Sequence, residues 1–164
     1  MRSTRFLPLN FVLLLGAGVL SAPVNATAQV APPGACPWLT QGMAARVLGG
    51  EVSVDVHVVD AREGSCSFVR TSDAAISLKL DVSKSTLPAC GADAMKLKGI
   101  GNEALRCTLP AANDRMGQKI ASRVRDRFFT LTLSQSKSAA AEPSDDLQND
   151  DLEQAAESVA GNLF

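Results

Sequence analysis

The sequence has few aromatic residues and no excess of positive charge. It contains no Tyr, one Trp and six Phe, of which Phe6 and Phe11 lie in a segment that we expect to be removed. So few aromatic side chains disfavour the stacking platforms with which proteins bind sugars or unpaired bases. With 16 Lys and Arg against 17 Asp and Glu, the net charge of −1 lacks the strongly basic signature of a nucleic-acid-binding protein.

Residues for catalysis are equally scarce. His57 is the single histidine, and the G-x-S-x-G motif of serine hydrolases is absent. Acidic residues between Asp145 and Asp151 lack the alternating spacing and central Gly of a calcium-binding loop. We interpret His57 as a surface residue, and we expect a non-enzymatic protein with no catalytic residue, no cofactor and no metal site.

One long hydrophobic run is present, close to Met1. Two arginines precede the apolar residues 6–20, and small residues then lead to the small-x-small sequence at residues 26–28. This order predicts a secretory signal peptide over residues 1–28, cleaved before Gln29. The mature protein is therefore expected to be secreted or periplasmic.

Two other interpretations of the run are a membrane anchor and a lipoprotein signal. The run is about 15 residues long and contains Pro8 and Asn10, whereas a spanning helix needs roughly 20 apolar residues. A lipid on Cys36 would require that cysteine to follow the run closely, but Leu20 lies 16 positions upstream. We therefore expect no transmembrane segment in the mature chain.

Removal of 28 residues from the 164 leaves 136, the size of one domain, and removes two arginines, so that the net charge falls from −1 to −3. Residues 29–35, rich in Pro and Ala, are expected to form a flexible leader. An α+β domain should follow over residues 36–136, then an acidic linker over residues 137–149. A C-terminal helix of the same domain is predicted over residues 150–164, where Asp150 and Glu153 match a capping box.

The first half of the domain predicts a helix and three strands. Thr40 is a suitable N-cap for a helix that ends at the Gly49-Gly50 pair. Three segments then show the alternation of half-buried strands, and the clearest alternation runs from Ile76 to Val82.

The second half suggests the same order, less clearly. A short helical stretch is expected over residues 92–97, then strands over residues 103–109, around Ile120 and Val124, and through residues 129–133. We thus expect an antiparallel sheet of about six strands, built from two helix-plus-three-strand halves, with the C-terminal helix packed on it.

All four cysteines lie in the mature part, and an even number in an exported chain indicates two disulfides. A zinc site is disfavoured because no C-x-x-C pair exists. In each predicted half, one cysteine precedes or opens the helix and another lies in a following strand. This parallel placement favours, among three possible pairings, Cys36 with Cys66 and Cys90 with Cys107.

Two further motifs have a structural and a functional interpretation. Residues 99–104 match the dinucleotide fingerprint G-x-G-x-x-A, but the strand and helix that the fingerprint needs are in the wrong order, so we favour a bent strand entry. Arg123, Arg125 and Arg127 belong to a basic stretch that could contact an anionic partner. We favour the alternative that the seven acidic residues of segment 138–164 compensate this charge.

The segment from Cys36 to Leu48-Gly49, the strand cysteine Cys66, the sequence of residues 97–104 and the last helix resemble small exported bacterial proteins and lipoproteins of unknown function. Some extracellular sensor domains share this layout. The resemblance implies an α+β domain without an established catalytic residue. We expect a non-enzymatic envelope protein that binds a protein or small ligand. The alternatives are a secreted inhibitor-like or accessory module with tandem α/β halves and, less favoured, an enzyme.

Overall fold

The computed structural model describes residues 34–60, 62–86, 90–91, 93–112, 115–136 and 145–164. All of these residues belong to one unit, Ala31–Phe164. The predicted signal peptide, residues 29–33 of the leader and residues 137–144 of the predicted linker lie outside the described residues.

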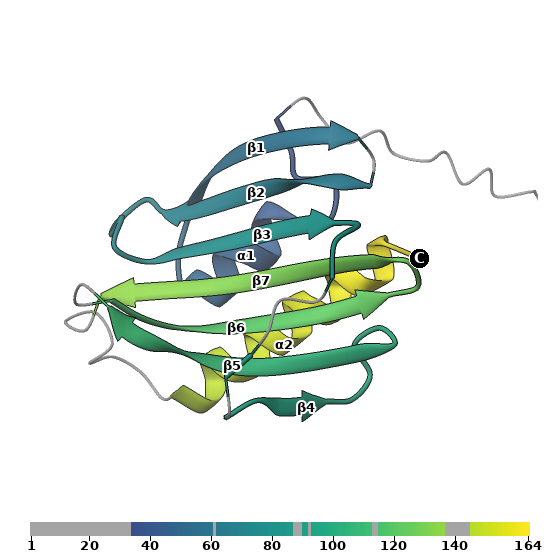
Figure 1. Cartoon of the computed structure of the whole chain (residues 1–164). Coiled ribbons are helices and arrows are strands. Elements are labelled where there is room, and N and C mark those ends of the chain that lie inside the picture. Colours follow the sequence, from purple (N-terminus) through teal and green to yellow (C-terminus); the bar gives the residue numbers. More distant parts are fainter. Residues whose placement is uncertain (1–33, 61, 87–89, 92, 113–114, 137–144) are drawn as a thin grey trace, which may run out of the picture. The chain divides into compact units, whose positions relative to one another are not determined.

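The described residues form one antiparallel sheet of seven strands, in the order β1-β2-β3-β7-β6-β5-β4 (Figure 1). Two meanders, β1 to β3 and β4 to β7, are joined by the pairing of β3 with β7. The strands are β1 (Val52–Asp60), β2 (Glu63–Arg70), β3 (Ser77–Ser83), β4 (Met95–Leu97), β5 (Glu103–Ala112), β6 (Arg115–Val124) and β7 (Arg127–Ser136).

Two helices, α1 (Gln41–Leu48) and α2 (Asp145–Asn162), lie on the same side of the sheet (Figure 1). Cys66, Leu80, Leu131 and Ile120 stand side by side across four strands and are fully buried. Their side chains point toward the helices, and we call this side the helix-covered face. Alternate residues of each strand point to the other side, the helix-free face.

Helix α1 begins and ends where the sequence predicts. The Met43 N–H donates a hydrogen bond to Thr40 Oγ at 3.2 Å, so Thr40 is the N-cap. Gly49 ends the helix with a φ of 66°, a left-handed conformation that glycine adopts without steric cost. The buried residues of α1 are Ala44, Val47 and Leu48.

Helix α2 begins at Asp145 and not at Asp150, so the prediction of a linker up to residue 149 was wrong. One contact of the extra turn is a hydrogen bond from Gln148 Nε2 to the Val47 carbonyl of α1, at 3.3 Å. Such a contact between distant residues cannot be read from the local sequence. Leu152, Ala155, Ala156 and Val159 of α2 are fully buried, as expected for a C-terminal helix that packs on the sheet.

The second half differs from its prediction. Met95–Leu97, expected in a helix, form strand β4, and Ala92 lies outside the described residues. Short apolar segments fit either structure, and here pairing with β5 decides between them. The second half therefore has four strands and no leading helix in its described part, and the sheet has seven strands instead of about six.

Both predicted disulfides are present, Cys36–Cys66 and Cys90–Cys107. They lie on opposite faces of the sheet. Cys66 points to the helix-covered face. Cys107 stands opposite Lys119, and the side chains of this pair point to the helix-free face. The chain runs from β3 in the middle of the sheet to β4 at its edge, and Cys90 joins this connection to β5 on the helix-free face.

The two glycines of the fingerprint-like motif have a conformational role. Gly99 and Gly101 have φ values of 85° and 61°, as expected for a bent entry into β5. Between them, Ile100 is 2% exposed and belongs to the core. Ser122 Oγ donates a hydrogen bond to the Ile100 carbonyl at 3.2 Å.

Substitution of the two glycines by alanine should change the free energy of unfolding by different amounts. A Cβ at Gly101 would lie 2.5 Å from the Arg123 carbonyl oxygen, whereas at Gly99 the nearest atom, Glu157 Oε1, is 3.8 Å away. Gly101→Ala should lower the free energy of unfolding by at least about 3 kcal/mol, and Gly99→Ala by about 1 kcal/mol. Urea denaturation measures both, and equal losses would contradict this account of the loop.

Candidate ligand-binding site

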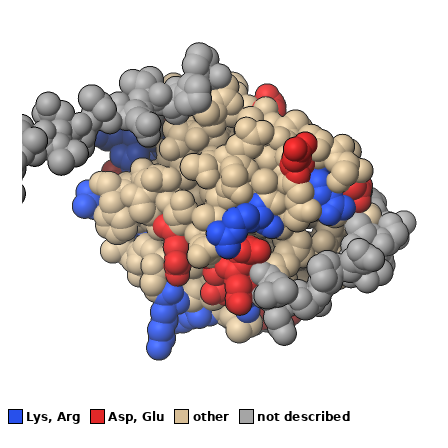
Figure 2. Space-filling model, turned by 180° about the vertical axis from the view of Figure 1, so that it is seen from behind, with Lys and Arg blue, Asp and Glu red and all other residues tan. Residues whose placement is uncertain are grey.

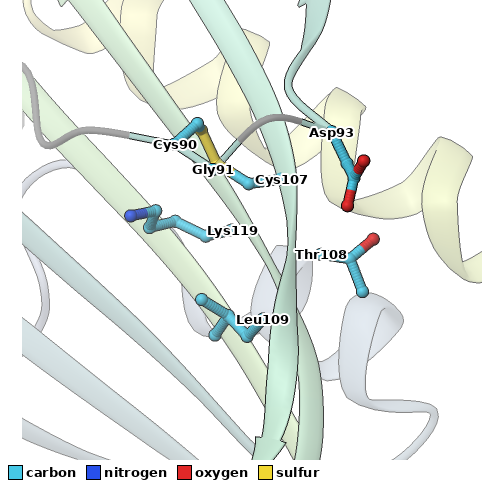
Figure 3. Close-up of a pocket in the computed structure, with 7 residues that line it drawn as sticks. All are labelled: Cys90, Gly91, Asp93, Cys107, Thr108, Leu109 and Lys119. Carbon is cyan, nitrogen blue, oxygen red and sulfur yellow. A yellow bond between two sulfur atoms is a disulfide. The ribbon is translucent and has the colours of Figure 1, made fainter.

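Two hollows lie next to each other at the β5 end of the sheet. The larger, of about 350 Å³, is drawn in Figure 3. The smaller, of about 150 Å³, shares Asp93 and Thr108 with it. The larger hollow is lined by Cys90, Gly91, Asp93, Cys107, Thr108, Leu109 and Lys119. The smaller hollow is lined by Asp93, Met95, Arg106, Thr108, Gln118 and Asn149.

The shortness of β4 creates the larger hollow. The paired residues of β4 reach β5 only as far as Arg106, so residues 107–109 of β5 have no described strand on their outer side. The Cys90–Cys107 disulfide holds the β3–β4 connection against this part of β5. The hollow thus has a covalently fixed wall.

Residues on both sides of β5 line the two hollows. Lys119 and Cys107 stand opposite each other on the helix-free face, and Thr108 stands opposite Gln118 on the helix-covered face. Figure 3 shows Asp93 and Thr108 on one side of the β5 ribbon and Lys119 on the other. The two hollows therefore lie next to each other at the side of β5 that β4 leaves unpaired.

Two residues that line the smaller hollow carry buried acceptors without partners in the described part of the chain. Gln118 Oε1 from β6 and Asn149 Oδ1 from α2 have no hydrogen-bond partner among the described residues. A buried polar atom left in this state costs about 1–3 kcal/mol. Both residues line the same hollow, so a ligand whose N–H or O–H groups reach these two oxygens would satisfy both of them.

Arg106, which also lines the smaller hollow, forms an ion pair with Glu153. Arg106 Nη1 donates to Glu153 Oε1 of α2 at 2.7 Å, and Arg106 Nη2 lies 3.7 Å from Met95 Sδ. The ion pair fixes α2 against β5 and compensates the arginine charge. Asp93 and Lys119, of opposite sign, are the other charged residues that line the hollows. The lining thus favours a polar ligand without large net charge.

The three arginines considered as a possible anion-binding surface do not share a face. Arg123 points to the helix-free face and lies 3.9 Å from Glu103. Arg125 occupies the β6–β7 turn with a φ of 56°, and Arg127 points to the other face, 3.7 Å from Asp126. The turn separates the three side chains, and anion binding by them stays the less favoured interpretation.

Two acidic residues of α2 pair with arginines outside the basic stretch that contains Arg123, Arg125 and Arg127. Asp151 Oδ1 lies 3.0 Å from Arg46 Nη2 of α1, and Glu153 pairs with Arg106. Arg125 does reach the C-terminal residue, through the Phe164 backbone oxygen at 3.2 Å and the Phe164 ring at 5.0 Å. Figure 2 shows acidic and basic side chains intermixed on the helix-covered side.

His57 lies on β1, at the opposite edge of the sheet from the hollows, and is exposed on the helix-free face. Gln118 and Asn149 were not foreseen as site residues. Asn149 fell in the predicted linker, and no sequence signal indicates that a β6 side chain and an α2 side chain meet.

Comparison of the chain with protein-family models, with curated proteins and with solved structures found no match. Within the described residues, no helix is both long and apolar enough to cross a membrane.

The ion pair beside the smaller hollow predicts a measurable coupling. The side chains of Arg106 and Glu153 are 20% and 34% exposed, against 58% and 31% for Arg46 and Asp151. In double-mutant cycles with alanine, the Arg106–Glu153 coupling should be about 1 kcal/mol, and the Arg46–Asp151 coupling should be smaller. A larger coupling for the pair with Arg46 would mean that the pair at the hollow does not fix α2.

Proposed function

We propose that the protein is an exported, non-enzymatic binding protein of the cell envelope that holds a small polar ligand at the β5 edge. The observation that carries this proposal is that Gln118 and Asn149 line one hollow, and that Gln118 Oε1 and Asn149 Oδ1 are buried without a described partner. They favour a ligand that donates hydrogen bonds.

The size and charge of the hollows narrow the ligand class. The larger hollow, of about 350 Å³, is at the lower end of the range for small-molecule pockets, and the smaller hollow, of about 150 Å³, lies below that range. The proposed ligand therefore extends from one hollow into the other. The carboxamides of Gln118 and Asn149, the Thr108 hydroxyl and the opposite charges of Asp93 and Lys119 suit a neutral or zwitterionic molecule with hydroxyl, amide or amino groups. Ordered water is the alternative occupant of the smaller hollow.

Export rests on two independent features. The sequence of residues 1–28 has the order of a secretory signal peptide. All four cysteines form disulfides, which persist in oxidising compartments such as the periplasm or the cell exterior.

A secreted inhibitor-like or accessory module is the second candidate. The observation that favours it is the helix-free face, on which polar side chains alternate along the strands and on which a partner protein could dock. This candidate assumes two equal halves, but the first half has three strands and the second half has four.

Thermal unfolding of the mature, oxidised protein with neutral polyols, amides, zwitterionic amino acids, and matched anions and cations tests the ligand class. At about 100 times its Kd, a specific ligand stabilises the folded state by about 2.7 kcal/mol. This stabilisation raises the Tm, and we expect the rise with a neutral or zwitterionic compound only.

Variants in the smaller hollow show where the compound binds. Gln118→Met and Asn149→Leu remove one unpaired oxygen each, so both should abolish the ligand-induced rise without lowering the Tm of the free protein. Ser67→Ala, on β2 with β3 and β7 between it and β6, is the control and should keep the rise. If no compound raises the Tm, or if the Gln118→Met and Asn149→Leu variants respond like the unmodified chain, the proposal is wrong.

A further inference from the structure

The two edges of the sheet differ in how well they are protected. Strand β4 is three residues long and carries Lys96 at its centre. Strand β1 is nine residues long and contains no Lys, Arg or Pro. Short strands, lysines, prolines and β-bulges are usual means by which proteins prevent an edge strand from pairing with another chain. Edge β4 is short and carries a lysine, whereas the described part of edge β1 has a bulge only near its end, between Val58 and Asp60.

The register of β1 shows which backbone groups point outward. The Thr71 N–H donates to the Glu51 carbonyl at 2.9 Å, and these residues continue the register in which Val52 stands opposite Arg70. Hydrogen-bonded and non-hydrogen-bonded pairs alternate along an antiparallel ladder. The odd-numbered residues from Glu51 to His57 therefore bond to β2, and Val52, Val54, Val56 and Val58 direct their N–H and C=O groups to the open edge.

Two apolar side chains near the end of β1 are exposed. Val58 and Val59 are 43% and 67% exposed, whereas Val52, at the start of the same strand, is 5% exposed. On the helix-free face, Asp55 and His57 are both exposed and are two positions apart. The edge thus combines uncovered apolar groups with a carboxylate and an imidazole.

We propose that two copies of this chain pair antiparallel through β1, around a two-fold axis at Val56. In this register, Val56 faces Val56 of the second copy, with N–H and C=O groups directed at each other. Asp55 faces His57 of the second copy on the helix-free face, and Val54 faces Val58 of the second copy on the helix-covered face. The two-fold symmetry forms the Asp55–His57 pair and the Val54–Val58 pair twice each. The sheets of the two copies then form one continuous sheet.

The two nearest registers, with the axis at Asp55 or at His57, are less complementary. An axis at Asp55 would place two carboxylates directly opposite each other, and like charges in that position are destabilising. An axis at His57 would place Asp55 opposite the apolar Val59. The axis at Val56 gives opposite polar groups on one face and apolar pairs on the other. This self-complementarity favours a second copy over an unrelated extended peptide.

Cysteine cross-linking tests the register. In a hydrogen-bonded antiparallel pair the Cα atoms are about 5.5 Å apart, within the range of a disulfide. Val56→Cys in the mature, oxidised protein should therefore give a covalent dimer on a non-reducing gel. Ser53→Cys is the control, because Ser53 faces Val59 of the second copy and the two cysteines would be about 20 Å apart. Equal cross-linking of both variants, or none of Val56→Cys, would overturn the proposal.

Charge exchange tests the Asp55–His57 pairs. Sedimentation equilibrium of the unmodified protein at about 0.1 mM should show a dimer. His57→Asp places carboxylates opposite each other and should weaken dimerisation roughly tenfold or more, and the double variant Asp55→Lys/His57→Asp should restore it. Both positions are exposed, so circular dichroism should show an unchanged fold. A monomeric unmodified protein, or a His57→Asp variant that dimerises normally, would contradict the proposal.

Discussion

Strand β3 pairs with β7 along its whole length, from Ser77 opposite Ser134 to Ser83 opposite Phe128. Three strands separate β3 from β7 in the sequence, so this pairing places β4 at the far edge and requires the chain to cross the sheet after β3. The helices cover one face, and Cys90 lies on the other. The Cys90–Cys107 disulfide, the hollow beside β5 and the open edge of β1 all follow from this pairing.

Local patterns in the sequence predicted the elements that depend on local interactions. The alternation from Ile76 to Val82 gave β3, and the Thr40 cap and the Gly49-Gly50 pair gave the ends of α1. The disulfide pairing was also right, although its premise of two equal halves was only partly right. Cys90 precedes a strand, not a helix, and each disulfide nevertheless joins a connecting segment to a strand.

Elements and contacts that depend on distant residues could not be predicted. Met95–Leu97 are a strand because β5 offers hydrogen bonds to them, and α2 starts early where Gln148 reaches α1. The candidate site was missed for the same reason. Gln118 and Asn149 are ordinary polar residues in the sequence, and only the packing of α2 on β6 brings these two residues to one hollow.

Hydrogen exchange of a Cys90→Ser/Cys107→Ser variant tests most directly whether the β3–β7 pairing organises the sheet while the disulfide fixes only its β4–β5 edge. The account predicts that the amides of Met95–Leu97 lose protection, because β4 is three residues long and pairs with β5 alone. The amides of β3 and β7 should keep the protection that they have in the unmodified protein. Loss of protection in β3 and β7 to the same extent as in β4, or full protection of β4 without the disulfide, would contradict the account.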